Sequence, residues 1–134
     1  RSEYTKVLTW WNQGLEQRIR LVDRYLSGAE GAVAGLASDD PAARAAARAR
    51  RLLETIRTAG GQHNLPLAHR TFEDAVAGAR EAYRLAGAGV PPAPDLGRAP
   101  RQGICAFCHY QLGGPGFSET MNDAFHREVL KAGG

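Results

Sequence analysis

The sequence predicts an all-α protein, a bundle of three main helices followed by a C-terminal segment with a short helix. Apolar residues recur every three or four positions, helix caps and terminating glycines bound these stretches, and no stretch alternates like a strand. The 134 residues suit one domain. We expect a single domain over residues 1–134, comprising a bundle (1–89), a Pro/Gly-rich connection (90–103) that returns along the bundle, and a C-terminal segment (104–134).

The first helix is expected from Glu3 to about Ser27. Its apolar residues are spaced by three or four positions, as one face of a helix requires: Tyr4, Leu8, Trp11, Leu15, Ile19, Val22 and Leu26. The following stretch, SGAEGAVAGLASDD, contains glycines that favour a loop, although an Ala-rich extension of the helix is also compatible.

The second helix is expected from Pro41 to about Thr58, because Asp40 is a good N-cap and proline suits the first helical position. Its core face is small: Ala45, Ala49, Leu52, Leu53 and Ile56.

The third helix should begin near Asn64 and Pro66 and end at Gly87 or Gly89. Its apolar stripe is Phe72, Val76, Ala79 and Tyr83. Small residues and aromatic residues together would leave room for a flat apolar cofactor between helices.

Composition excludes several classes of protein. No apolar run approaches the roughly 20 residues of a membrane span, and no nucleic-acid-binding motif is present. The net charge of +3 is modest, and much of the basic excess lies in ARAAARARRLL, residues 43–53. These arginines predict either a solvated helix face or a docking patch for an acidic partner or haem propionates.

Both cysteines of the chain lie in ICAFCHYQLGG, as Cys105 and Cys108, with His109 directly after them. In Cys-x-x-Cys-His, two thiols bind the vinyl groups of a haem and the histidine binds the iron. A disulfide would close a very small loop, and a thioredoxin-like dithiol needs a βαβ context that this sequence lacks. Zinc bound by Cys105, Cys108, His126 and His63 remains open, but it leaves His109 without a role.

The segment CAFCH resembles the haem-binding signature of c-type cytochromes. GGQHNLPLAHRTFEDAVAGAREA and ETMNDAFHREVL are similar to elements of multihaem cytochrome c families, including the C-terminal region of pentahaem nitrite reductases. Here Leu65 intervenes before Pro66, and Phe125 adjoins His126. The resemblance implies one haem c per chain, and it maps distal iron ligands of those families onto His63 and His126. This chain has one haem motif and no residue set that maps onto a nitrite-reducing site, so we expect no enzyme.

The iron would be held by His109 on the proximal side and by a second ligand on the distal side. His63 is our first choice, because it precedes a helix start, and His126 is the second. Met121 ranks third, and His69 is expected to be a surface or internally satisfied histidine. Two axial histidines would give a low-spin, low-potential iron suited to electron relay.

We therefore expect a c-type cytochrome that carries electrons, with a redox partner protein or other haem subunits as partners. A homo-oligomer is compatible with this, and membrane contact would need a partner or an anchor absent from this chain. Covalent haem implies export to the periplasm or an equivalent compartment, by a signal that is also absent. The alternatives are a haem-based sensor or gas-binding module with an open distal side, and a zinc-stapled interaction domain.

Overall fold

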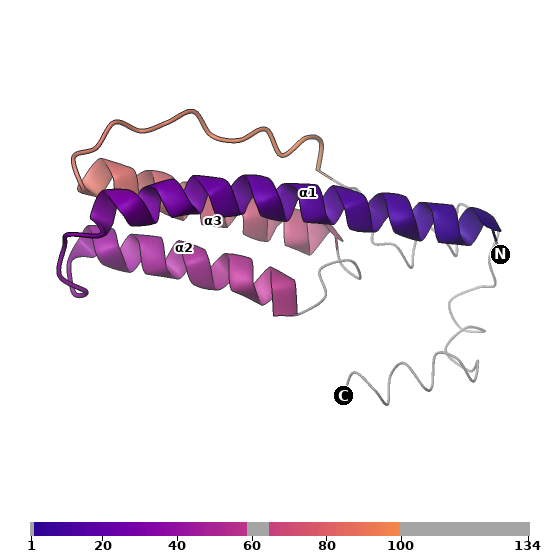
Figure 1. Ribbon diagram of the computed structural model, residues 1–134, viewed down its shortest axis with the longest axis horizontal. Coiled ribbons are helices and arrows are strands. Elements are labelled where there is room, and N and C mark those ends of the chain that lie inside the picture. Colours follow the sequence, from indigo (N-terminus) through magenta and orange to yellow (C-terminus); the bar gives the residue numbers. More distant parts are fainter. Residues whose placement is uncertain (1, 59–64, 100–134) are drawn as a thin grey trace.

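The structure is a computed structural model that describes residues 2–58 and 65–99. These residues form three helices, α1 (Ser2–Val33), α2 (Pro41–Thr58) and α3 (Leu65–Leu85), and contain no strand. The helices lie side by side and alternate in direction, so the bundle runs up, down and up (Figure 1). The predicted all-α bundle is confirmed, whereas the predicted C-terminal short helix lies outside the described residues.

Helix α1 is longer than predicted, because it continues past Ser27 to Val33. The Ala-rich extension therefore replaces the expected loop over these residues. Ala29 and Val33 are buried and continue the core face of the helix, so burial offsets the low helix propensity of Gly28 and Gly31. Glu30 also accepts a hydrogen bond from Arg50 of α2, with 2.7 Å between Oε1 and Nε. The connection to α2 is thereby shortened to residues 34–40.

Helix α2 has the predicted bounds, and its start has the predicted cap. The Oδ1 atom of Asp40 accepts a hydrogen bond from the amide of Ala42 at 2.8 Å. The carbonyl of Asp40 accepts the first helical bond, from the amide of Arg44 at 2.9 Å. Pro41 sits at the first helical position, where its missing N–H removes no helical bond.

Helix α3 ends at a glycine, as predicted. The amide of Ala88 donates to the carbonyl of Tyr83 at 3.0 Å, and the amide of Gly87 donates to that of Arg84 at 3.1 Å. These two bonds form a Schellman motif, which requires a left-handed residue after the helix. Gly87 has a φ of 67° and meets that requirement without the steric cost that other residues would bear.

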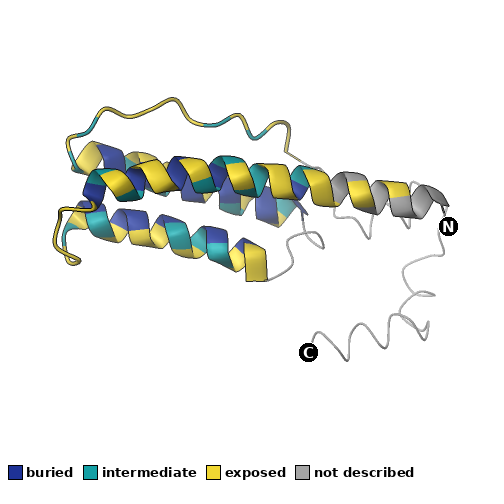
Figure 2. Cartoon of the chain, in the orientation of Figure 1, coloured by how far each residue is buried: buried dark blue, intermediate teal, exposed yellow. Residues whose placement is uncertain are grey.

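The buried residues of the three helices form one core (Figure 2), in which α2 contributes Ala42, Ala45, Ala46 and Ala49 as well as Leu53 and Ile56. The largest fully buried side chains are Phe72, Leu26, Leu53 and Val22. Helix α2 approaches α3 closely, because a Cβ built on Gly78 would lie 3.1 Å from the Cβ of Ala49. Most of the predicted apolar face is buried, although Ile19 and Leu52 are only partly covered.

Residues 88–99, here called the return segment, run back along the bundle without regular structure (Figure 1). Two side chains of α1 hold this segment. The hydroxyl of Tyr25 donates to the carbonyl of Pro91 at 2.8 Å, and Nε of Arg18 donates to that of Leu96 at 2.9 Å. Leu96 also packs against the core. The described part of the Pro/Gly-rich connection, up to Ala99, thus lies along the bundle.

Candidate functional site

The residues predicted to bind haem lie outside the described part of the chain. Cys105, Cys108, His109 and His126 belong to residues 100–134, and His63 belongs to residues 59–64. The third-ranked ligand, Met121, lies there as well. The described part of the chain therefore does not test the roles of these residues, which stay predictions.

The described helices do show where these segments join the bundle. Helix α2 ends at Thr58, α3 begins at Leu65 and the return segment reaches Ala99 at the same end of the bundle (Figure 1). The chain that contains His63 and the chain that leads to Cys105 are thus attached to one end of the molecule. The opposite end carries the connection from α1 to α2 and the end of α3.

His69 lies in the first part of α3, near this shared end, and it is buried with 4% of its surface exposed. Its Nε2 atom lies 3.4 Å from a carboxylate oxygen of Glu73, one turn further along the helix. Its Nδ1 atom is buried and has no hydrogen-bond partner among the described residues. The expectation of a surface histidine is therefore wrong, and the alternative of an internally satisfied histidine holds only for the Nε2 atom. The spacing from His69 to Phe72 and Val76 already placed this residue on the core face.

Two aromatic residues of the described core pack against each other. The rings of Tyr25 and Tyr83 meet edge to face, with centroids 5.7 Å apart, and the hydroxyl of Tyr83 donates to the carbonyl of Tyr25 at 3.4 Å. A Cβ at Gly28 would overlap that Tyr83 hydroxyl. At Tyr83 and at the Ala49–Gly78 contact, small residues serve close packing and leave no room for a flat cofactor. The side chains of Tyr4, Trp10 and Trp11 are not described.

The arginines of residues 43–53 divide into two groups. Arg50 turns toward α1, where it pairs with Asp23 and with Glu30, the latter through a second bond of 2.8 Å from Nη2 to Oε2. The hydrogen bond that Arg50 donates to Glu30 is the main reason why the pKa of Arg50 is raised, and the bond to Asp23 adds to this effect, whereas burial opposes it. Arg50 therefore links α1 to α2.

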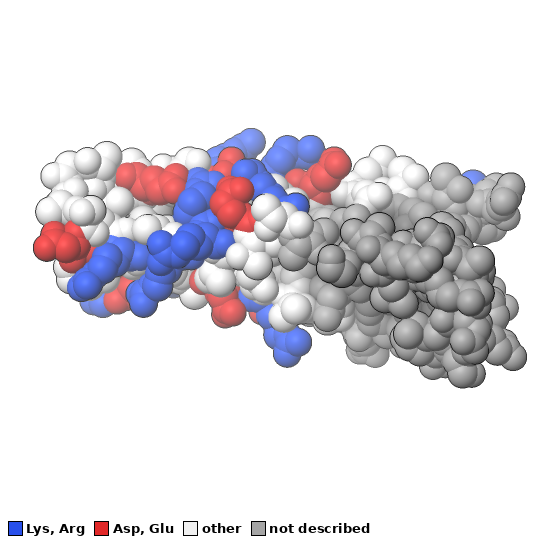
Figure 3. Space-filling model, turned by 90° about the horizontal axis from the view of Figure 1, so that it is seen from below, with Lys and Arg blue, Asp and Glu red and all other residues white. Residues whose placement is uncertain are grey.

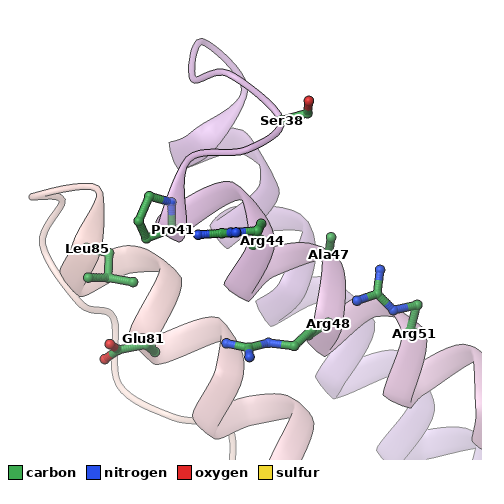
Figure 4. Close-up of a pocket in the computed structure, with 8 residues that line it drawn as sticks. All are labelled: Ser38, Pro41, Arg44, Ala47, Arg48, Arg51, Glu81 and Leu85. Atoms are coloured by element: carbon green, nitrogen blue, oxygen red, sulfur yellow. The ribbon is translucent and has the colours of Figure 1, made fainter.

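The other group, Arg44, Arg48 and Arg51, lines a surface pocket of about 520 Å³ between α2 and α3. Basic side chains gather in a band over this face of the molecule (Figure 3). Arg44 and Arg48 extend from α2 toward α3 across the pocket (Figure 4). Sequence reasoning identified the arginine-rich stretch but not this division, which follows from the burial of Ala45, Ala46 and Ala49 on the opposite face.

Within residues 2–58 and 65–99, no cluster of three or more His, Cys, Asp or Glu side chains is arranged to hold a metal ion. No helix in that part of the chain has both the length and the apolar character needed to cross a bilayer. Comparison of the chain with family models, with curated proteins and with solved structures finds no match.

Proposed function

We propose that this chain is a c-type cytochrome that carries single electrons through one covalently bound haem c. The observation that carries the proposal is the Cys105-x-x-Cys108-His109 motif, which contains both cysteines of the chain. The donor set fits the group, because two thiols match two vinyl substituents and an imidazole matches the iron. When bound, the haem supplies the one-electron couple.

The residues of the chain have separate roles in this proposal. Cys105 and Cys108 tether the porphyrin, and His109 ligates the iron from the proximal side. His63 is the first choice for the distal ligand and His126 the second. The joining of both haem-related segments to one end of the bundle supports a site at that end, since it shortens the chain needed to bring His63 and His109 together.

The proposal includes a location and partners. Covalent attachment of haem places maturation in the periplasm or an equivalent compartment, and the partners would be a redox protein or other haem subunits. Two imidazole ligands leave no open position at the iron, so the chain would relay electrons and would not act as an enzyme.

The decisive experiment is a pyridine haemochrome spectrum of the mature protein. We expect about one haem per chain with the spectrum of thioether-linked haem, and we expect covalent haem to be lost in the double variant Cys105→Ser, Cys108→Ser. A colourless mature protein would refute the proposal. If the protein contained zinc and no haem, the alternative of an interaction domain stabilised by a bound zinc ion would be supported instead.

The distal ligand is tested by the spin state of the iron. His63→Ala should convert a low-spin spectrum to a high-spin one that binds carbon monoxide, whereas His126→Ala should leave it low-spin. His69→Leu is the matched control, because His69 is buried in the bundle and has no proposed iron contact. Rapid carbon monoxide binding by the unmodified protein would instead support the haem-based sensor.

A further inference from the structure

Three arginines on one face of α2 lack the partners that neighbouring basic residues have. Arg50 is paired with carboxylates of α1, and Arg84 forms two bonds with Glu81, at 2.6 and 2.7 Å. The guanidinium groups of Arg44, Arg48 and Arg51 make no ion pair or hydrogen bond to any residue of the described chain. Like charges one turn apart on a helix repel each other, so an anion bound at this face would relieve the repulsion.

The spacing and the pocket combine these charges into one site. Positions 44, 48 and 51 follow the helical repeat, and they span about 10 Å along the axis of α2. Helix α3 closes the far side of the pocket with Glu81 and Leu85. The carboxylate of Glu81 points away from Arg48 in the close-up (Figure 4), and Arg84 already engages it. The pocket therefore presents three guanidinium groups that no described residue engages, beside an apolar wall of Pro41, Ala47 and Leu85.

The pocket volume indicates the size of the ligand. About 520 Å³ lies within the usual range for small-molecule sites. Guanidinium groups bind phosphate and carboxylate oxygens through paired N–H donors. The three arginines are distributed over about 10 Å of helix, so a ligand with more than one anionic group can engage all three with less rearrangement of their side chains than a single small anion would need.

We propose that Arg44, Arg48 and Arg51 bind a small molecule that carries at least two phosphate or carboxylate groups. This site is formed by described residues alone, so it does not depend on haem attachment. It also gives a specific role to the arginines for which the sequence predicts either a solvated helix face or a general docking patch. An extended acidic segment of another protein is the competing occupant, and the hollow between α2 and α3 favours the compact ligand.

The test is isothermal titration calorimetry of the full chain at low ionic strength with pyrophosphate, citrate and chloride. We expect saturable 1:1 binding of pyrophosphate or citrate, and the tighter of the two identifies the source as phosphate or carboxylate. The triple variant Arg44→Gln, Arg48→Gln, Arg51→Gln should weaken that binding at least about thirtyfold, at roughly three- to fivefold per arginine. Arg24→Gln, which removes an exposed arginine of α1 outside the pocket, should leave it unchanged.

Three results would overturn the proposal. The first is the absence of saturable binding to the unmodified chain, and the second is equal binding by the triple variant. The third is tighter binding of a glutamate-rich peptide than of either small anion, which would assign the face to an acidic protein. Circular dichroism of the triple variant ensures that lost binding reflects lost charge, because exposed arginines leave the helical fold intact when replaced.

Discussion

Gly28 of α1 faces the hydroxyl of Tyr83, and Gly28→Ala should destabilise the protein. A Cβ at this position would overlap the hydroxyl oxygen and would lie 3.4 Å from Cζ of the ring. Tyr83 is buried, with 7% of its surface exposed, and its ring is held edge to face against Tyr25. The ring must therefore shift, and the bond from its hydroxyl to the carbonyl of Tyr25 is weakened.

The net effect follows from three contributions. Replacing glycine by alanine inside a helix is favourable by about 0.5–1 kcal/mol. Overpacking at a filled site costs about 1–3 kcal/mol, and loss of the Tyr83 hydrogen bond costs about 0.5–1.5 kcal/mol. We therefore expect Gly28→Ala to lower the free energy of unfolding by about 0.5–4 kcal/mol, the sum of these contributions. Gly31→Ala is the matched control, because a Cβ there meets nothing within 4 Å, and it should raise stability by up to about 1 kcal/mol.

Urea unfolding followed by far-ultraviolet circular dichroism measures both effects. Tyr83→Phe removes the clashing oxygen, so Gly28→Ala should be nearly neutral when it is combined with that substitution. The pair should then show a coupling energy of more than about 1 kcal/mol in a double-mutant cycle. An equal loss of stability from Gly28→Ala with and without Tyr83→Phe would refute the proposed clash.

Three other changes test separate parts of the bundle. Arg50→Gln should lower the free energy of unfolding by about 1–2 kcal/mol, a value reduced because the ion pairs are partly exposed. Arg51→Gln should have almost no effect. If the difference in stability between these two variants did not change with added salt, the ion-pair explanation would be contradicted. Burial raises the pKa of Tyr25, with the Tyr83 contribution reinforcing this and Arg80 opposing it. Ionisation of Tyr25 therefore favours unfolding. The free energy of unfolding should be constant below the pKa of tyrosine in the unfolded chain, about 10, and should fall as the pH rises through the higher pKa of the folded state. Tyr25→Phe should reduce this fall in urea titrations at several pH values. His69→Leu should raise the urea midpoint, by about 1 kcal/mol of unfolding free energy, because it removes a buried nitrogen without a partner; a lower midpoint would contradict that accounting.

The fold was predictable where a local signal and the tertiary structure agree. Asp40 and Pro41 determine the start of α2 through backbone chemistry alone, and Gly87 ends α3 for the same reason. The end of α1 was not predictable from local signals. Its last turns contain Gly28 and Gly31, which favour a loop by themselves, and they are helical because Ala29 and Val33 find buried surroundings on the other helices.

The binding residues show a similar division. The haem prediction rests on covalent chemistry that a short motif encodes, so the sequence alone provides it. The separation of Arg50 from Arg44, Arg48 and Arg51 depends on where Asp23 and Glu30 lie across the helix interface. The spacing of His69 from Phe72 indicated that His69 lies on the core face of α3. The expectation of a surface position instead followed the usual preference of histidine for partly exposed positions.

The two anchors of the return segment determine how this chain tolerates changes in length. Tyr25 and Arg18 are seven residues apart on α1, a distance of about 10 Å along the helix axis. The five residue steps from Pro91 to Leu96 can span about 16 Å in an extended conformation, which is more than the distance between the two anchors. Deleting one residue there shortens that span by about 3 Å, so the segment still reaches both anchors and Ala99 stays in place. The point from which the chain departs toward Cys105 is thus set by the Arg18–Leu96 bond rather than by the number of residues before it.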